Sequence, residues 1–296
     1  MAERPFANLL TFDTEEWYHA NYDDIDPAAL RGRGSNFPAQ VDALLAMCAE
    51  AGAKATFFVL GAVAEDHPAV VRAIAAAGHE IASHGYGHAL AYRQTVAEFA
   101  ADVRKSVAIL EDVTGAAIRG YRAPSWSIVA ANHHYLAALE ELGLIYDASI
   151  FPVRTFLYGI PDAPTHIHHP VVAGRSLKLW EVPTSVVRLA GRNIGYSGGF
   201  YFRLFPGFFV EYAIRRANRR GQPAIVYLHP RELDPGERRL ALPAKEAFIH
   251  YHGIGGTQGK LAVLLDRFRF TSVIDHLKTI DPSIKEARLP GTKKSI

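Results

Sequence analysis

The chain has 296 residues, 49% of them hydrophobic, with 32 basic and 30 acidic side chains. A chain of this length and apolar content can bury a substantial core as one large domain or two small ones, which excludes a disordered or fibrous protein. The two signs of charge nearly cancel, so nucleic acid is not an expected partner and any anion binding must be local.

The chain shows no sign of a disulfide framework or a targeting segment. The single cysteine, Cys48, lies in the apolar stretch AQVDALLAMCAEAG, where we expect a small core residue rather than a nucleophile. The first residues, MAERPFANLLTFD, lack the apolar core of a secretion signal, and no run of about 18 apolar residues occurs. We therefore expect a cytoplasmic protein with no transmembrane segment.

Short apolar runs alternate with amphipathic stretches along the chain. In chain order they predict a strand at 7–12, a helix at 37–52, a strand at 55–60, a helix at 68–77, a strand at 79–84 and a helix at 96–114. The pattern continues with a strand at 117–122, a helix at 132–142, strands at 144–149 and 177–183, a helix at 207–221, a strand at 224–230 and a helix at 258–268. Residues 151–172, rich in Pro and His, predict a long loop.

This alternation is typical of βα units around a parallel sheet, and about seven such units favour a closed barrel over an open sheet. We predict one catalytic domain over residues 1–296, with a core at about 7–230 and a C-terminal extension at 231–296 that packs on the barrel and frays at its end. Chemistry in barrels gathers where strands end. The polar residues at predicted strand ends are Asp13, Glu15, His84, Arg122, Asp147, Glu181 and His229.

The segment SHGYGH places His84 and His88 four residues apart, a spacing that lets two imidazoles reach one metal ion. The segment TFDTEEW offers carboxylates, and because side chains alternate along a strand, Asp13 and Glu15 share one side while Glu16 faces away. One acid could then hold metal while the other takes a proton. The competing interpretations are a polar loop for the histidines and strand-end caps for the acids.

A family resemblance rests on five segments in fixed order: TFDTEEW, SHGYGH, RAPSW, DASIFP and YLHP. They resemble the five motifs of the polysaccharide deacetylase family, the nodulation-protein-type deacetylase homology domain of carbohydrate esterases, over roughly residues 7–230. The phrases AGHEIASHG, IRGYRAPS and YGIPDAP are further similar to the branch linked to bacterial exosortase and exopolysaccharide gene clusters. The resemblance implies a distorted (β/α)7-type barrel.

The resemblance also implies a role for each matching residue. Asp13 would be the general base, oriented by Arg122, and His229 the general acid, supported by Asp147. Glu15, His84 and His88 would bind a divalent metal, most simply Zn, with Co, Mn or Ni as other choices. The backbone N–H near Ser125 would hold the oxyanion, and Trp126 or Phe151 would line the acetyl pocket.

These roles agree with elementary electrostatics. A carboxylate beside a guanidinium stays ionised at neutral pH and can accept a proton, and a histidine beside a carboxylate stays protonated and can give one. Two departures from the family pattern stand out: Thr14 separates Asp13 from Glu15, where many members have adjacent aspartates, and Phe151-Pro152 stands where a tryptophan often lines the pocket.

We therefore predict a hydrolase that removes N-acetyl groups from an amino sugar of a bacterial exopolysaccharide or its lipid-linked precursor. The alternatives are a related C–N hydrolase acting on a small cyclic amide or ureide, with or without metal, and a glycan-binding protein that has lost catalysis. The resemblance implies transient contact with a lipid-linked glycan or membrane surface. The basic helix face of Arg215, Arg216, Arg219 and Arg220 is more typical of a solvated surface than of a site for anionic glycan or lipid phosphate.

Overall fold

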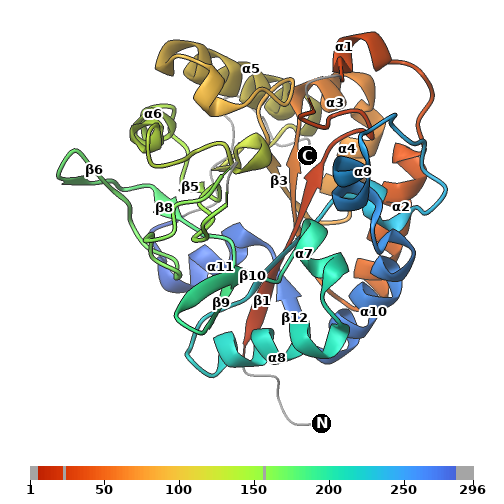
Figure 1. Ribbon diagram of the computed structural model, residues 1–296. Helices are drawn as coiled ribbons and strands as arrows, with labels where there is room; N and C mark the ends of the chain where they lie inside the picture. The colour runs from red at the N-terminus through yellow and green to blue at the C-terminus, as the bar shows by residue number, and fades with distance from the viewer. Residues whose placement is uncertain (1–5, 23–24, 156–157, 285–296) are drawn as a thin grey trace, which may run out of the picture.

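The structure is a computed structural model that describes residues 6–22, 25–155 and 158–284 (Figure 1). Its centre is a curled parallel sheet with strand order β11-β1-β2-β3-β4-β5-β8, and β12 pairs in parallel with the start of β1. The strands are β1 (Ala7–Thr14), β2 (Thr56–Val59), β3 (Glu80–Ser83), β4 (Gly120–Tyr121), β5 (Tyr146–Asp147), β8 (Trp180–Glu181), β11 (Ile225–Leu228) and β12 (Arg269–Thr271). The predicted α/β barrel is confirmed.

Each predicted helix is present, with ends shifted by a few residues: α2 (Phe37–Glu50), α4 (Pro68–Ala76), α5 (Val96–Thr114), α6 (Leu136–Glu141), α8 (Gly207–Asn218) and α10 (Thr257–Arg267). The bounds of α5 match the prediction because its end signals are explicit. Thr95 and Glu98 form a capping box at its start, and Gly115 takes the left-handed conformation at its end (φ 67°). Helix α6 is shorter than predicted because a 3₁₀ turn over His133–Tyr135 precedes it.

The sequence pattern missed several short elements: the helices α1 (Pro27–Leu30), α3 (Gly61–Asp66), α7 (Gly199–Leu204), α9 (Ala244–Tyr251) and α11 (Val273–Ile280), and the hairpins β6 (Val171–Val172) with β7 (Arg175–Ser176) and β9 (Val186–Leu189) with β10 (Arg192–Gly195). Most are too short for a hydrophobic period to appear. The described residues of the predicted loop, 151–155 and 158–172, are mostly irregular, as predicted, and an isolated bridge joins His168 to Glu181.

The sheet is a barrel with one seam, between β8 and β11. Within the described residues no ladder joins these two strands. The seam is instead spanned by single hydrogen bonds, from the Ile225 amide to Ser185 Oγ (2.8 Å) and from the Tyr227 amide to the Ser197 carbonyl (3.0 Å). The residues after β8 therefore cover the side of the barrel that a further strand would occupy.

Alternation along β1 divides the core into an interior and an outer layer. Leu10 and Phe12 belong to the large cluster that packs under the surrounding helices, and Phe12 contacts Phe57 at 4.9 Å between ring centroids. Leu9 belongs to a second cluster with Phe58, inside the barrel. Burying each large apolar side chain contributes about 1.5–3 kcal/mol, so both layers stabilise the strand that carries the predicted catalytic acids.

The C-terminal extension joins the sheet and the core. Strand β12 pairs with Ala7–Leu9, and residues of α10 and β12 belong to the same hydrophobic cluster as β1 and β2. This pairing has no counterpart in the predicted strands because β12 is only three residues long.

Candidate active site

The strand register aligns the carboxyl ends of six strands. Thr14, Val59, Ser83, Tyr121, Asp147 and Glu181 form one row of directly paired residues. Glu15, His84 and Arg122 each lie one residue beyond this row. Because the strands are parallel, these three side chains come to the same edge of the barrel.

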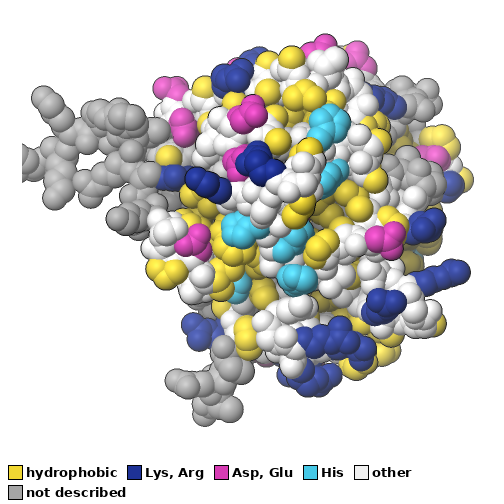
Figure 2. Space-filling model, turned by 90° about the vertical axis from the view of Figure 1, so that its left-hand side faces the viewer, with side chains coloured by type: hydrophobic (Ala, Val, Ile, Leu, Met, Phe, Trp, Pro, Cys, Tyr) yellow, Lys and Arg dark blue, Asp and Glu magenta, His cyan; other side chains and the backbone are white. Residues whose placement is uncertain are grey.

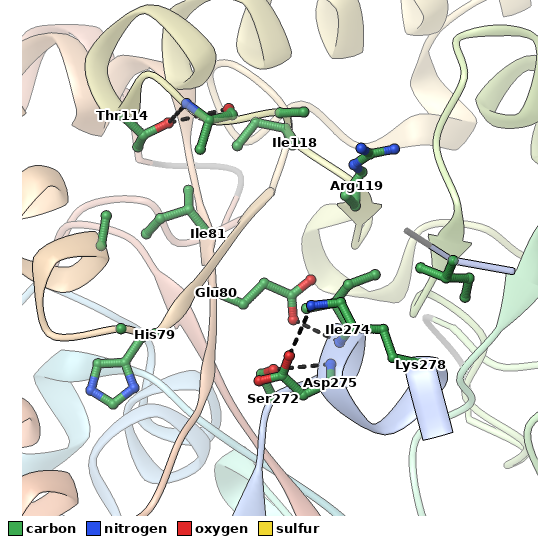
Figure 3. A pocket seen from close by; sticks show the side chains of 15 residues that line it. His79, Glu80, Ile81, Thr114, Ile118, Arg119, Ser272, Ile274, Asp275 and Lys278 are labelled. Atoms are coloured by element: carbon green, nitrogen blue, oxygen red, sulfur yellow. Dashed lines mark hydrogen bonds and ion pairs between the residues drawn. The ribbon is translucent and has the colours of Figure 1, made fainter. Parts of the chain in front are cut away.

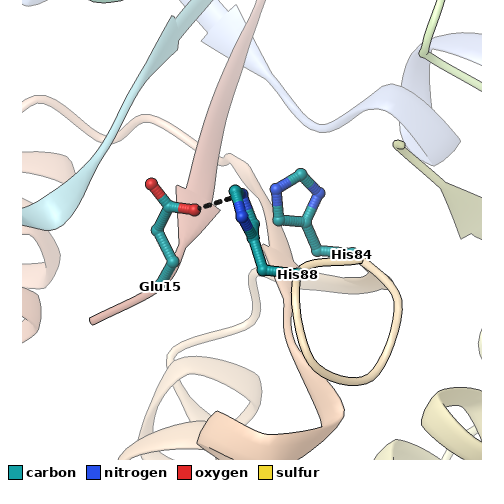
Figure 4. Close-up of side chains that lie close together, drawn as sticks. All are labelled: Glu15, His84 and His88. Carbon is teal, nitrogen blue, oxygen red and sulfur yellow. Dashed lines mark ion pairs between the residues drawn. The ribbon is translucent and has the colours of Figure 1, made fainter. Parts of the chain in front are cut away.

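Glu15, His84 and His88 meet at this edge (Figure 4). Each offers one ligand atom, and the three atoms lie within 4.8 Å of one another. His88 Nε2 is 2.8 Å from Glu15 Oε2, and the two imidazole rings are 5.5 Å apart between centroids. All three side chains are buried.

The loop after β3 bends back so that His88 can reach the cluster. Gly85 has a φ of 79°, and a Cβ there would lie 2.8 Å from Asp102 Oδ2, so this position requires glycine. The amides of Gly61 and Ala62 donate to the carbonyls of Gly85 and Tyr86 and hold the loop against α3. His88 itself has a φ of 62°, a strained conformation for a residue with a side chain.

The protonation states of the cluster suit metal binding. Burial lowers the pKa of His84 to about 4, so this imidazole is neutral. Its Nδ1 donates to the Arg122 carbonyl (2.8 Å), which leaves Nε2 as the metal-facing nitrogen. Burial alone would raise the pKa of Glu15, but His88 and His229 together hold it well below its usual range.

The cluster fits a divalent cation. Glu15 Oε2 is buried with His88 Nε2 beside it at 2.8 Å, and His88 Nδ1 is buried without a hydrogen-bond partner in the described part of the chain. Two imidazoles and one carboxylate are a common ligand set of catalytic zinc sites, which leave the fourth position open.

Asp13 and Arg122 form a buried ion pair beside the cluster. Arg122 Nη1 donates to Asp13 Oδ1 (2.6 Å) and to Thr11 Oγ1 (2.9 Å), and its Nε donates to the Ala148 carbonyl. The guanidinium lies 4.0 Å from the centre of the Phe58 ring. The structure thus places Arg122 where it can orient Asp13, as the sequence comparison implied.

His229 follows β11 and approaches the cluster from the opposite side, with Nε2 3.5 Å from Glu15 Oε1. Its Nδ1 lies 3.0 Å from Glu232 Oε2 and makes a hydrogen bond there. Although burial lowers the pKa of His229, the carboxylates of Glu232 and Glu15 raise it above its usual value. No hydrogen bond or ion pair between His229 and Asp147 occurs among the described residues, so the implied partner of His229 is replaced by Glu232.

Asp147 is engaged elsewhere. It accepts hydrogen bonds from the Ser149 amide (3.0 Å) and Ser149 Oγ (2.6 Å), and it is the strand partner of Glu181. Burial raises the pKa of Asp147, and burial together with the neighbouring Asp147 carboxylate raises that of Glu181 well above its usual value. The two carboxyls therefore act as a buried pair that holds a proton.

The turn at Pro124–Trp126 borders the same edge. Ser125 and Trp126 both have positive φ values, 50° and 54°, although neither is glycine. Trp126 packs against Phe151 (5.9 Å between ring centroids) and Tyr227 (4.5 Å), and its Nε1 is buried with no partner among the residues described. This aromatic cluster can enclose a small apolar group such as a methyl.

Three buried residues near the site were not singled out by the sequence. Glu232 follows His229 by three residues in HPREL, a spacing that could have identified it, whereas Arg203 lies in an apolar stretch with no motif. His19 accepts a hydrogen bond from the Glu16 amide, and its ring is 6.1 Å from that of His88. Burial lowers the pKa of His19 to about 3.

Glu16 faces away from Glu15, as predicted, and contacts Ser35 and His67.

A separate cavity of about 380 Å³ lies at the other end of the barrel (Figure 3). It is lined by residues at the starts of β3 and β4 and by α11, including Glu80, Arg119 and Lys278. None of the predicted catalytic residues lines this cavity, so we do not assign the active site to it.

The predicted basic face lies on α8 and its C-terminal end. Arg215, Arg219 and Arg220 are exposed, and Arg216 Nη1 donates to the hydroxyl of Tyr212 (3.2 Å). Figure 2 shows Lys and Arg side chains gathered along the lower edge, the level at which α8 lies in Figure 1. Among the described residues no helix is both long enough and apolar enough to cross a membrane.

Two family models match the chain side by side. Residues 9–146 match the polysaccharide deacetylase model, and residues 148–278 match a domain of unknown function (DUF3473). The metal-ligand candidates and Arg122 fall in the first match, and His229 and Glu232 in the second.

Curated relatives match part of the chain. A peptidoglycan deacetylase of Helicobacter pylori is 31% identical over 142 residues, which cover 44% of this chain and 47% of the relative. A peptidoglycan deacetylase-like protein, FGM2, of Gibberella zeae is 33% identical over 97 residues, or 33% of this chain and 28% of the relative. The matched regions are thus less than half of either relative.

Solved structures share the fold over nearly the whole chain. A Mycobacterium smegmatis protein described as a candidate polysaccharide deacetylase superposes with a TM-score of 0.59 at 20% identity, covering 98% of this chain and 96% of that one. A family 4 carbohydrate esterase from Streptomyces lividans, solved with acetate, gives a TM-score of 0.50 at 16% identity, covering 90% and 92%. Residues 9–146 thus match the polysaccharide deacetylase family, and the two solved structures, at 20% and 16% identity, show that the chain shares their fold.

Proposed function

We propose that this protein hydrolyses the N-acetyl group of an amino sugar in a bacterial exopolysaccharide or its lipid-linked precursor. The observation that carries the proposal is the convergence of a ligand cluster, an Arg-paired carboxylate and a histidine at one edge of the barrel. Glu15, His84 and His88 lie within 4.8 Å, and His229 approaches Glu15 from the other side. The names of the curated relatives support deacetylation of a glycan, and the choice of an exopolysaccharide rests on the sequence resemblance.

Glu15, His84 and His88 would hold the metal, most simply Zn²⁺. A divalent cation in such a site polarises a carbonyl group and makes water more acidic. Asp13, which accepts a hydrogen bond from Arg122 Nη1, would accept the proton of the attacking water. The Ser125 amide donates no hydrogen bond within the described residues and would stabilise the oxyanion.

His229 would complete the reaction by giving a proton to the departing nitrogen. Its Nδ1 is engaged with Glu232, so Nε2 is the nitrogen that faces the cluster. Trp126 and Phe151 would enclose the acetyl methyl. The location of the protein, in the cytoplasm or at a membrane surface, remains a prediction from the sequence.

The test is metal content together with acetate release. We expect about one equivalent of divalent metal in the purified protein, lost in His84→Ala and retained in Asp13→Asn. Acetate release from N-acetylglucosamine oligomers should fall at least about 10²-fold in both variants and be abolished by chelator. His134→Ala, at an exposed histidine, is the control and should behave like the wild type.

Two results would contradict the proposal. Metal-free protein that is insensitive to chelator would favour hydrolysis of a cyclic amide instead. An Asp13→Asn variant that functions like the wild type would point to a glycan-binding protein.

A further inference from the structure

The ring of His229 is held by a carboxylate from its own turn. Glu232 lies in the 3₁₀ turn Pro230–Leu233 directly after His229 and is fully buried. Its Oε2 accepts hydrogen bonds from the backbone amide of His229 (2.9 Å) and from its ring Nδ1 (3.0 Å). Because the backbone amide and the ring of His229 both donate to Glu232 Oε2, the carboxylate fixes the ring relative to its own backbone.

The other oxygen of this carboxylate is bound by a buried arginine. Arg203, from α7, donates through Nε to Glu232 Oε1 at 2.6 Å, and only 5% of its surface is exposed. Its Nη2 donates to the Ile249 carbonyl (2.9 Å) and its Nη1 to the His252 carbonyl, at the C-terminal end of α9. Free helix carbonyls attract a cation, so this contact keeps the guanidinium in place.

A buried ion pair such as Arg203–Glu232 contributes little net stability to a core. Removing two opposite charges from water costs several kcal/mol per ion, and apolar side chains of similar volume often serve stability as well or better. Here the pair instead gives Glu232 a single orientation, because both of its oxygens have fixed donors. The neighbouring Asp147, bound to Ser149, makes no such contact with His229 in the described part of the chain.

We propose that Glu232, clamped by Arg203, is the positioning residue that fixes the orientation and tautomer of His229. A carboxylate accepts hydrogen bonds only, so Nδ1 must carry a proton, and Nε2 is the nitrogen that faces Glu15. This inference rests on the proposed function for the role of His229, but the contact itself does not depend on it. His229, Glu232 and Arg203 all lie in the matched domain of unknown function, so the proposal assigns a positioning role to part of residues 148–278.

The direct test is ¹⁵N NMR of the histidine rings in metal-loaded protein, with the His229 signals assigned from a His229→Gln variant. We expect the Nδ1–H tautomer in the neutral ring of the wild type. Glu232→Leu removes the acceptor of the Nδ1 proton, so the Nε2–H form, with its nitrogen facing Glu15, should appear. Asp147→Asn should leave the tautomer as in the wild type.

The second readout is steady-state acetate release. Glu232→Leu should lower kcat by about 10²-fold with KM within about twofold, because the general acid is misplaced while substrate contacts remain. Glu140→Leu is the matched control: it removes the carboxylate of an Arg–Glu pair with the same 2.6 Å contact, to Arg175. Its kcat and KM should be unchanged.

Glu232→Leu alone leaves Arg203 buried with no opposite charge, so the double variant Arg203→Met/Glu232→Leu, which removes both charges, is tested beside it. The double variant should fold and show the same tautomer change and the same loss of kcat. A retained Nδ1–H tautomer in both variants, or a change in Asp147→Asn instead, would overturn the proposal. If the wild type releases no acetate but the tautomer changes as expected, the positioning role stands and the proposed function fails.

Discussion

At the scale of single residues, Arg122 connects the parts of the candidate active site. It is 1% exposed, bonds Asp13 and Thr11 across the barrel, and lies over the ring of Phe58. The backbone carbonyl of Arg122 also accepts a hydrogen bond from the ring of His84 and fixes that ring. One side chain therefore links the predicted base to the predicted metal ligands.

Arg122→Met should destabilise the protein by about 3–5 kcal/mol, because it leaves the Asp13 carboxylate buried without its cation. The free energy of unfolding in urea, followed by tryptophan fluorescence, measures this loss. Arg31→Met is the control, since Arg31 forms an equally short pair with Asp66 (2.6 Å) but the two side chains are 43% and 30% exposed. We expect it to lose less than about 1 kcal/mol. Equal effects of the two substitutions would show that burial of the Asp13–Arg122 pair is unimportant.

At the scale of elements, Glu80 joins the start of β3 to its neighbours. It accepts hydrogen bonds from Tyr146 (2.8 Å) and from Thr56 (2.5 Å). It also accepts one from the first turn of α11, at the Ile274 amide (3.0 Å) (Figure 3). Burial raises the pKa of Glu80 from 4.5 to about 7 despite these donors. The carboxyl is therefore partly protonated near neutral pH.

This raised pKa predicts a pH dependence of stability. Because the folded pKa exceeds the unfolded one, the stabilisation is fully present below about pH 4.5 and is lost as the pH rises through about 7. The loss is at most about 3 kcal/mol, from about 1.4 kcal/mol per pKa unit. Glu80→Gln cannot ionise, so its urea stability relative to the wild type should increase between pH 5 and pH 8. A constant difference between the two proteins across this range would refute the assignment.

At the scale of the whole molecule, the C-terminal extension belongs to the barrel. Its strand β12 pairs with β1, and Leu261, Leu264 and Phe268 pack into the cluster that covers the sheet. Two family models divide the chain near residue 147, but β1, in the first match, pairs directly with β11, in the second. The described residues of both matches thus share one sheet.

Leu264→Ala should therefore destabilise the entire protein by about 2–5 kcal/mol, as expected for a core leucine that is 2% exposed. Its neighbour Val263 is 41% exposed, and Val263→Ala should change stability by less than about 0.5 kcal/mol. Denaturant unfolding followed by both far-UV circular dichroism and tryptophan fluorescence is the measurement. If Leu264→Ala shifted only one of two unfolding transitions and left the other unchanged, the extension would unfold separately from the rest of the barrel.

Sequence pattern alone determined the order and type of the main helices and strands. Alternation of apolar runs marked the strands, and the capping residues of α5 defined its bounds. The pattern also predicted that His84, His88 and a strand-end acid lie at one edge, and the family resemblance selected Glu15 as that acid, which the structure places with the two histidines.

Only the tertiary structure decided which carboxylate contacts His229. Asp147 and Glu232 are both acids near strand ends, and sequence order cannot tell which of them reaches the ring. The 3₁₀ turn after β11 brings Glu232 back to Nδ1, while Ser149 takes the hydrogen bonds of Asp147. Burial, which sets the charge of each of these groups, likewise depends on contacts between residues far apart in the chain and therefore has no local sequence signal.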